Sequence, residues 1–279
     1  MIVEYNSQLL EYLLENTKDK SKNNIKSLLK NGQVLVNNKV ITQYNYNLKK
    51  GQKISFNYNV DRGKSLNIIY EDKNIIVIDK PHGLLTIADA KEKENTAYHT
   101  VREYLNKKKK NSKVFVIHRI DKDTSGIVMF AKNEETKRLY QDSWEDIVKL
   151  REYIAIVSGT LDQKEGTIQT YLTENTTGLV YSTKKGGKLA ITKYKVLKEN
   201  KKYSMLQVDI ETGRKNQIRV HMKEIGHPII GDKKYGAPSS PINRLALHAS
   251  CLKIINPITK EVMTFKSKPQ NKFENLFKN

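Results

Sequence analysis

The residues best suited to chemistry lie close together in the segment 113–133, KVFVIHRIDKDTSGIVMFAKN. An apolar stretch leads into the run His118 to Asp121, and a second apolar stretch follows Thr124 to Gly126. Polar and charged groups in a turn between two buried strands are where a scaffold presents catalytic side chains. A simple hairpin turn held by Asp and Thr hydrogen bonds would explain Thr124 to Gly126. It would not explain a His-Arg-x-Asp run at the mouth of a core strand, so the segment predicts a functional site.

The run HRIDKDTSG, followed by apolar residues and Ala-Lys, resembles the active-site motif of the RluA-type pseudouridine synthases, H-R-L-D-x-x-T-S-G. Three further segments resemble motifs of this family in the family's order, and the resemblance covers nearly all of residues 66–270. They are IYEDKNIIVIDKPHGLL at 69–85, EYIAIVSG at 152–159 and GRKNQIRVHMKEIGHPIIGDKKYG at 213–236. The departures are Ile120 for Leu, His82 for a small residue and Asn216 for the motif's His, and none removes a charged catalytic group.

The resemblance implies an RNA isomerase that converts uridine to pseudouridine. This reaction breaks the bond from the base nitrogen to the ribose, turns the base and reattaches it through carbon. Because substrate and product contain the same atoms, we expect no metal, nucleotide or redox cofactor. The histidines agree with this, since none has zinc-ligand spacing with a cysteine pair. By resemblance Asp121 is the catalytic carboxylate; whether it attacks the sugar, attacks the base or removes a ribose proton stays open.

The resemblance also implies roles for four residues around Asp121. The carboxylate must be ionised, and Arg219 would favour its charged form, with an ordinary surface position as the alternative. Arg119 would fill the place in the RNA that the target nucleotide leaves when it flips out of the stack. Tyr153 would stack on the uracil, and Leu245 would be a wall of its pocket. For both of these residues a position in the core of a strand is the alternative.

The charge of the chain is strongly positive. Fifty Lys and Arg residues stand against thirty Asp and Glu residues, which gives a formal net charge of +20 and a pI near 9.7. Basic side chains that neutralise phosphates release counterions and supply affinity that does not depend on sequence. Good solubility of a Lys-rich chain is the alternative, but an excess of this size favours a nucleic-acid partner. Only eight of the fifty are Arg, and Arg119, Arg214 and Arg219 fall within the motifs.

Residues 1–60 form a separate unit in the sequence pattern. Leucines at helical spacing over 9–14 predict one helix, and Ser21 as an N-cap with Gly32 beyond the end predicts a second. A short strand, an Asn-Asn turn at 37–38 and a last strand at 53–56 complete the pattern. After Asp19 this unit contains no acid, whereas it holds eight Lys. One-sided charge of this kind favours contact with phosphates over a merely solvated face.

The segments SKNNIKSLLKNGQVLVNNKV and LKKGQKISF in this unit resemble the alpha-L RNA-binding module, which was first named for a small-subunit ribosomal protein. The module's pattern is a basic helix, then G-x-V-x-V-N-x-K-V, then G-D-x-I. The chain departs from it at Gln52, where an acid is usual, and at Lys22, where Arg is common. The resemblance implies that Lys22, Lys26 and Lys30 of the basic helix contact RNA.

Residues 66–279 have a mixed pattern of helices and strands. Strands are expected at 74–79, 113–118, 126–131, 153–157, 190–196 and 204–210, and helices at 96–106, 134–150 and 217–225. The strands cluster in pairs with helices between the groups. We therefore expect an α+β fold: a catalytic domain at 66–279 with a largely antiparallel mixed sheet and flanking helices, and a small N-terminal α/β RNA-binding module at 1–60.

The rest of the composition points to a cytoplasmic protein. No apolar run approaches the length that a bilayer span needs. The N-terminus lacks the basic and apolar regions of a secretory signal, and the single cysteine, Cys251, fits a reducing compartment.

The combined pattern predicts a pseudouridine synthase that acts on a loop or bulge uridine in structured RNA. Ribosomal RNA is favoured over transfer RNA because the N-terminal module is of a ribosome-associated type. We expect a monomer without an obligate protein partner. The alternative is a non-catalytic RNA-binding or ribosome-assembly protein on the same scaffold. The two hypotheses differ at Asp121, since only an enzyme requires it.

Overall fold

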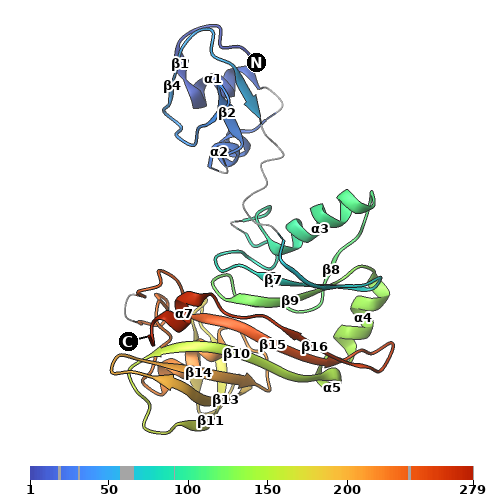
Figure 1. Cartoon of the computed structure of the whole chain (residues 1–279), viewed down its shortest axis with the longest axis vertical. Coiled ribbons are helices and arrows are strands. Elements are labelled where there is room, and N and C mark those ends of the chain that lie inside the picture. The colour runs from blue at the N-terminus through green and yellow to red at the C-terminus, as the bar shows by residue number, and fades with distance from the viewer. Residues whose placement is uncertain (18–19, 31, 57–65, 91, 238–239, 279) are drawn as a thin grey trace. The chain divides into compact units, whose positions relative to one another are not determined.

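The structure is a computed structural model that describes residues 1–17, 20–30, 32–56, 66–90, 92–237 and 240–278. The chain divides into two compact units, Met1–Ser65 and Leu66–Asn279, which are described separately (Figure 1). Within the described ranges, no helix combines the length and the apolar character that a membrane-spanning helix needs.

The first unit packs two helices against short strands. Helices α1 (Leu9–Asn16) and α2 (Lys22–Lys30) bury Leu13 and Ile25 completely. Strands β2 (Val34–Val36), β3 (Lys39–Val40) and β5 (Ile54–Phe56) form one sheet in the order β3-β2-β5, and β1 (Ser7–Gln8) pairs with β4 (Asn47–Leu48). This core explains why so short a segment holds its own fold.

The turns and the cap expected in the first unit are present. The Ser21 hydroxyl accepts a hydrogen bond from the Asn24 amide at 3.2 Å and so caps the start of α2. Asn37 and Asn38 both have positive φ angles, 48° and 64°, between the antiparallel strands β2 and β3. Two-residue hairpin turns require this left-handed backbone, which Asn adopts more readily than most residues.

The second unit is built on an eleven-stranded sheet. Nine of its strands follow the order β12-β11-β13-β14-β10-β15-β9-β7-β6, while β16 pairs with β15 and β8 pairs with β9. Its strands are β6 (Ile68–Glu71), β7 (Ile75–Lys80), β8 (Phe115–Val116), β9 (Ser125–Ala131), β10 (Val148–Ser158), β11 (Glu165–Glu174), β12 (Val180–Thr183), β13 (Lys188–Glu199), β14 (Tyr203–Ile210), β15 (Leu247–Ile255) and β16 (Val262–Lys266). Among the described strands, only β9 and β15 pair in parallel. The expected α+β fold with a largely antiparallel sheet is confirmed.

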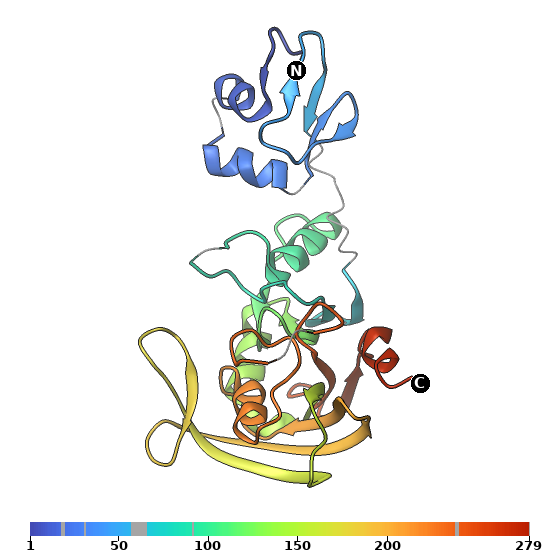
Figure 2. The same cartoon turned by 90° about the vertical axis from the view of Figure 1, so that its left-hand side faces the viewer.

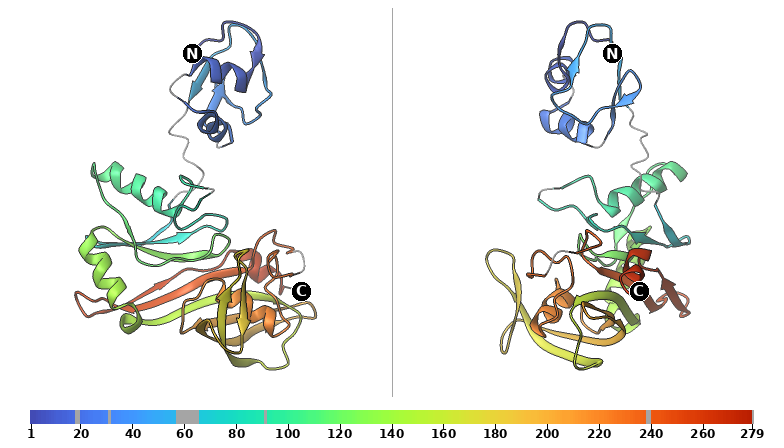
Figure 3. Two further views of the ribbon diagram at one scale, coloured as in Figure 1. Left: turned by 180° about the vertical axis from the view of Figure 1, so that it is seen from behind. Right: turned by 60° about the vertical axis from the view of Figure 1, so that its left-hand side comes forward.

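Five helices flank this sheet. They are α3 (Ala97–Lys108), α4 (Glu134–Asp142), α5 (Trp144–Ile147), α6 (Gln217–Glu224) and α7 (Asn271–Asn275). Helices α3 and α4 lie beside the β7–β9 part of the sheet, and α6 contacts β12 and β13 (Figure 3). The loops at the ends of β11, β12 and β13 extend away from the rest of this unit (Figure 2). The candidate site described below lies near the junction of β9, β10 and β15.

One sequence-based expectation differs from the structure at residues 134–150. A single helix was expected there, but the structure has two short helices, α4 and α5, and the second ends at Ile147. Val148 begins β10. The reason is long-range pairing: β10 lies between β14 and β15, and Val148 is already opposite Ile254. Such pairing overrides a local helical pattern, which is only a weak prior.

Gly126 allows the parallel junction of β9 with β15. Its φ angle is +112°, and a Cβ atom built on it would lie 2.2 Å from the backbone oxygen of Ala249. We expect Gly126→Ala to destabilise the second unit by about 3 kcal/mol or more, through backbone strain and overpacking. Denaturant unfolding followed by the fluorescence of Trp144, the single tryptophan of the chain, measures this. The control is Gly83→Ala: Gly83 has a φ angle of +77°, but a methyl added there would meet open space. Equal stability of the two variants would contradict the close approach of Gly126 to Ala249.

Candidate active site

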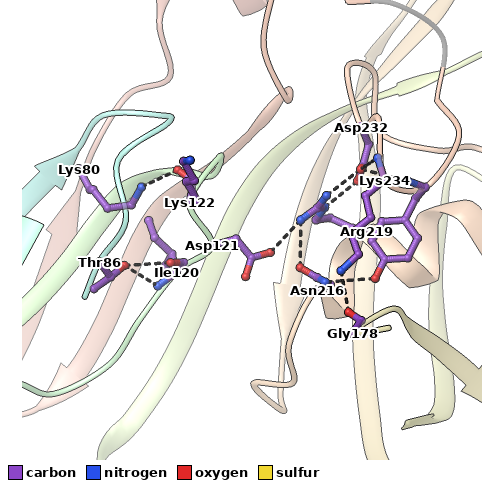
Figure 4. A network of polar contacts seen from close by, with 11 residues as sticks. Lys80, Thr86, Ile120, Asp121, Lys122, Gly178, Asn216, Arg219, Asp232 and Lys234 are labelled. Carbon is purple, nitrogen blue, oxygen red and sulfur yellow. Dashed lines mark hydrogen bonds and ion pairs between the residues drawn. The ribbon is translucent and has the colours of Figure 1, made fainter. Parts of the chain in front are cut away.

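Asp121 lies in a loop, residues 117–124, between β8 and β9; we call it the Asp121 loop. Two side chains hold this loop, one from the last residue of β7 and one from the segment after that strand. The buried Lys80 ammonium donates hydrogen bonds to the backbone oxygens of Lys122 at 3.1 Å and of Leu84 at 2.6 Å. The Thr86 hydroxyl donates to the Ile120 oxygen at 2.9 Å (Figure 4). The backbone on both sides of Asp121 is therefore fixed.

His118 anchors the start of the same loop. Its Nε2 accepts a hydrogen bond from the Met129 amide at 3.2 Å, and its ring lies 5.1 Å from that of Trp144. Burial, with a smaller contribution from the positive charge of Arg151, lowers the pKa of His118 to about 3. The imidazole is therefore neutral with its proton on Nδ1, so His118 positions the loop and holds no positive charge at neutral pH.

Arg219 connects Asp121 to a second, fully buried carboxylate. Its Nη1 lies 3.4 Å from Asp121 Oδ2, while its Nε and Nη2 each lie 2.7 Å from an oxygen of Asp232. Burial alone would lower the pKa of Arg219, but the hydrogen-bonded Asp232 and the charge of Asp121 raise it above its ordinary value. A fork-on-carboxylate pair of this kind fixes the guanidinium in one orientation. Asp232 thus aims the remaining nitrogen of Arg219 at Asp121 (Figure 4).

Asn216, which stands where the family motif has His, belongs to the same network. It immediately precedes α6 with a φ angle of +55°. Its Oδ1 accepts a hydrogen bond from Arg219 Nη1 at 2.9 Å, and its Nδ2 donates to the Tyr235 hydroxyl at 3.1 Å. Asn tolerates left-handed backbone. Its side-chain oxygen also helps to hold Arg219 in place.

Asp121 lines a cavity of about 470 Å³. The cavity is lined by the Asp121 loop, residues 85–89, part of β10 and the residues around the start of α6. Tyr153 of β10 lies in this lining between β14 and β15. Burial raises the pKa of Tyr153 to about 12, so its hydroxyl stays protonated at neutral pH. The lining of the cavity therefore includes the carboxylates of Asp89 and Asp121, the aromatic rings of Trp144 and Tyr153, and several cationic groups.

Most of the expected site residues come together here. Asp121, Arg119, Tyr153 and Arg219 all line the cavity, and Arg119 is exposed. Leu245 is not in the lining: it lies before β15 in the buried core, while Leu247, the first residue of that strand, faces the cavity. The structure therefore places Leu245 in the buried core, which was the alternative to a wall of the pocket.

The expected RNA contacts of the first unit lie on α2. Lys22 and Lys26 are exposed and stand one helical turn apart, so they share a face. The Lys26 ammonium lies 5.9 Å from the centre of the Tyr44 ring. Lys30 closes the same helix, but its side chain lies outside the described part of the structure.

The sequence did not reveal the residues that hold Asp121 and Arg219 in place. Asp232, Lys80 and Thr86 were given no role, although Asp232 and Lys80 lie inside segments already matched to family motifs. The available signal was a charged residue within an apolar run, as in IIVIDKPHG, since a buried charge needs a partner. Nothing in the sequence named those partners. In the described ranges, no group of three His, Cys, Asp or Glu side chains could hold a metal ion.

Comparison with known proteins gives two family matches. Residues 74–224 match the model of the RNA pseudouridylate synthase family, and residues 9–54 match the S4 domain. The uncharacterized RNA pseudouridine synthase YhcT of Bacillus subtilis is 31% identical over 269 residues, covering 92% of this chain and 88% of that protein. The ribosomal large subunit pseudouridine synthase D of Haemophilus ducreyi is 29% identical, covering 94% and 89%.

A solved structure agrees on the fold. Human RNA pseudouridylate synthase domain containing 4 superposes with a TM-score of 0.63 at 22% identity, covering 75% of this chain and 91% of that one. At this identity the likeness concerns the fold alone.

Proposed function

The chain belongs to the RNA pseudouridylate synthase family and carries an S4 domain, and on that premise we propose that it isomerises a uridine of ribosomal RNA with Asp121 as the catalytic carboxylate. Membership makes it an isomerase that acts on RNA. The observation that carries the assignment of Asp121 is its position: it lies at the cavity, 3.4 Å from a guanidinium that a second carboxylate holds in place. No cofactor enters the proposal, because uridine and pseudouridine are isomers.

The proposed step at Asp121 needs an ionised carboxylate next to a flipped uridine. Arg219 forms an ion pair with Asp121 through Nη1, while Asp232 keeps Arg219 from closing on Asp121 as a bidentate pair. The carboxylate therefore remains available to the sugar or the base. Its side chain keeps 31% of its surface exposed, which leaves room for a reacting atom.

The remaining cavity residues supply contacts to the flipped nucleotide in this proposal. Tyr153, as a neutral phenol, stacks on the uracil, and Leu247 takes the role of apolar wall that was expected for Leu245. Arg119, exposed next to Asp121, occupies the place in the RNA that the uridine leaves. In this proposal the enzyme acts as a monomer.

Ribosomal RNA is the proposed substrate, with transfer RNA as the alternative. Support comes from relatives named ribosomal large subunit pseudouridine synthase D and from the S4 domain at 9–54. The test is to map pseudouridines in total RNA from cells with and without the protein. A position lost from ribosomal RNA and restored by the purified enzyme supports the proposal. A lost position in transfer RNA would overturn the choice of substrate.

We propose that residues 1–60 increase RNA affinity and that residues 66–279 perform the reaction. Deleting 1–60 is expected to weaken RNA binding and to flatten its dependence on salt, because the eight Lys that follow Asp19 in this unit would no longer neutralise phosphates. A short RNA at saturating concentration should still be isomerised. Filter binding over a series of salt concentrations and tritium release from uridine labelled at carbon 5 measure the two effects. A folded but inactive deletion variant would contradict the division of labour.

A further inference from the structure

Two arginines that the proposed chemistry does not use also line the Asp121 cavity. Arg151 lies in β10, two residues before Tyr153, and Arg214 lies just before α6. They belong to segments that are far apart in the sequence, yet both reach the same wall of one cavity. The question is which ligand two guanidinium groups in one cavity would bind.

Each of the two guanidinium groups is oriented by a backbone oxygen. Arg151 Nη2 donates a hydrogen bond to the Glu211 oxygen, and Arg214 Nε donates to the Leu189 oxygen at 2.9 Å. The remaining N–H groups of each fork are left for another acceptor. The buried Nε of Arg151 has no hydrogen-bond partner in the described structure, and a buried donor without a partner is uncommon.

Gly213 brings the two arginines together. A Cβ atom built on Gly213 would lie 2.6 Å from Arg151 Nη1, so this guanidinium lies close to the backbone next to Arg214. Burial lowers the pKa of Arg151, and the positive charge of Arg214 lowers it further. The two cations therefore repel each other.

The nearby Glu145 carboxylate raises the pKa of Arg151, but among the described residues it forms no ion pair with either arginine. Where the structure describes the chain, the ion pairs formed by arginines are those of Arg138 and Arg219, and neither Arg151 nor Arg214 has one. The ligand best suited to two planar forks is a tetrahedral oxyanion, because guanidinium groups bind phosphate oxygens in parallel pairs of hydrogen bonds. An RNA strand that enters the cavity brings such a group with every nucleotide.

We propose that Arg151 and Arg214 together bind one phosphodiester of the RNA strand that carries the target uridine. The inference rests on the proposed function, since it assumes that the flipped nucleotide enters this cavity. The bound phosphate fixes the nucleotide's backbone, so the ribose reaches Asp121 in a defined orientation. It also relieves the repulsion between the two cations, which makes the free cavity selective for an anion.

The test measures the binding of a short oligouridylate by the full chain over a series of salt concentrations. One phosphate contact on a single strand contributes about 0.7 to the slope of log K against log salt. The double variant Arg151→Gln/Arg214→Gln is expected to lose about this amount. Each single variant is expected to keep most of the slope, because the remaining guanidinium still neutralises the same phosphate. The Arg151→Lys/Arg214→Lys variant should retain the slope but bind more weakly, since it keeps the charges and loses the forks.

The matched control is Arg102→Gln/Arg138→Gln, which removes the same number of charges from the exposed surfaces of α3 and α4. An equal slope for this control and for the Arg151→Gln/Arg214→Gln variant would overturn the shared phosphate site. Two equal, additive losses from the single variants would also overturn it, because they indicate two separate phosphates. Should the Gln double variant fail to fold by circular dichroism, the Lys double variant decides by its affinity: weaker binding at an unchanged slope supports the site, and wild-type affinity overturns it.

Turnover on unmodified ribosomal RNA, measured in parallel, separates this inference from the proposed function. An active wild type whose double variant keeps the full slope leaves the proposed function intact and removes the phosphate site. A wild type that isomerises no RNA, together with a reduced slope in the double variant, leaves the phosphate site and removes the function.

Discussion

Asp121→Asn is expected to abolish pseudouridine formation and to leave the protein folded and bound to RNA. Asn has nearly the shape of Asp and keeps an oxygen that can accept from Arg219 Nη1, so the Asp121 loop stays in place on its Lys80 and Thr86 supports. The amide carries no charge and is neither a competent nucleophile nor a base. Turnover should fall by at least about 10²–10⁴-fold, the contribution of a positioned acid or base.

The measurement is tritium release from uridine labelled at carbon 5, with circular dichroism and RNA binding run alongside. Binding should persist, because Lys and Arg contacts to phosphates supply most of the affinity. The control is Asp123→Asn, which removes an acid of the same loop that does not line the cavity; its turnover should stay near the wild-type value. Wild-type turnover in Asp121→Asn would show that another group does the chemistry. A wild type without turnover on any RNA would favour a non-catalytic RNA-binding protein.

Asp232→Asn is expected to reduce both stability and turnover. Asp232 is 1% exposed and is the bidentate partner of Arg219, whose side chain is 10% exposed. Removing one partner of a buried ion pair typically costs about 3–5 kcal/mol, since an uncompensated charge remains in a low-dielectric environment. We expect about 3 kcal/mol, the lower end of that range, because Asp121 partly compensates the charge. Turnover should fall as well, because Arg219 is no longer held in its orientation.

Denaturant unfolding followed by Trp144 fluorescence measures the loss of stability. The control is Glu134→Gln, which breaks an exposed ion pair with Arg138. The side chain of Glu134 is 59% exposed and that of Arg138 is 72% exposed. Such a pair contributes about 0–1 kcal/mol. Arg219→Lys, which keeps the charge and loses the fork, should reduce turnover without abolishing it. If Asp232→Asn unfolds at the same denaturant concentration as Glu134→Gln and turns over like the wild type, Asp232 does not hold the site.

Local features of this fold could be predicted because short-range chemistry decides them. Ser21 caps α2 since its hydroxyl reaches the Asn24 amide one turn away, and the Asn37–Asn38 turn follows from the left-handed backbone that a two-residue hairpin needs. The helix expected at 134–150 failed for the opposite reason. Val148 enters a strand because its partner Ile254 is more than a hundred residues away in the sequence.

The sequence by itself determined the candidate site residues, because Asp121, Arg119, Tyr153 and Arg219 stand in motifs with a recognisable order. Alternation could not separate Leu245 from Leu247, since residues two apart share one face of a strand. Only the tertiary structure places the start of β15 at Leu247.

The tertiary structure alone also decided how the charged groups are held. Arg219 meets Asp121 across 98 residues of sequence, and Lys80 reaches the Asp121 loop across 42. Burial then selects the partners, because a charge removed from water is stable only where opposite charges or hydrogen-bond acceptors surround it. A linear pattern shows that Asp232, Lys80 and Arg151 are charged. Which hydrogen-bond partners hold each of them follows only from what the fold packs around it.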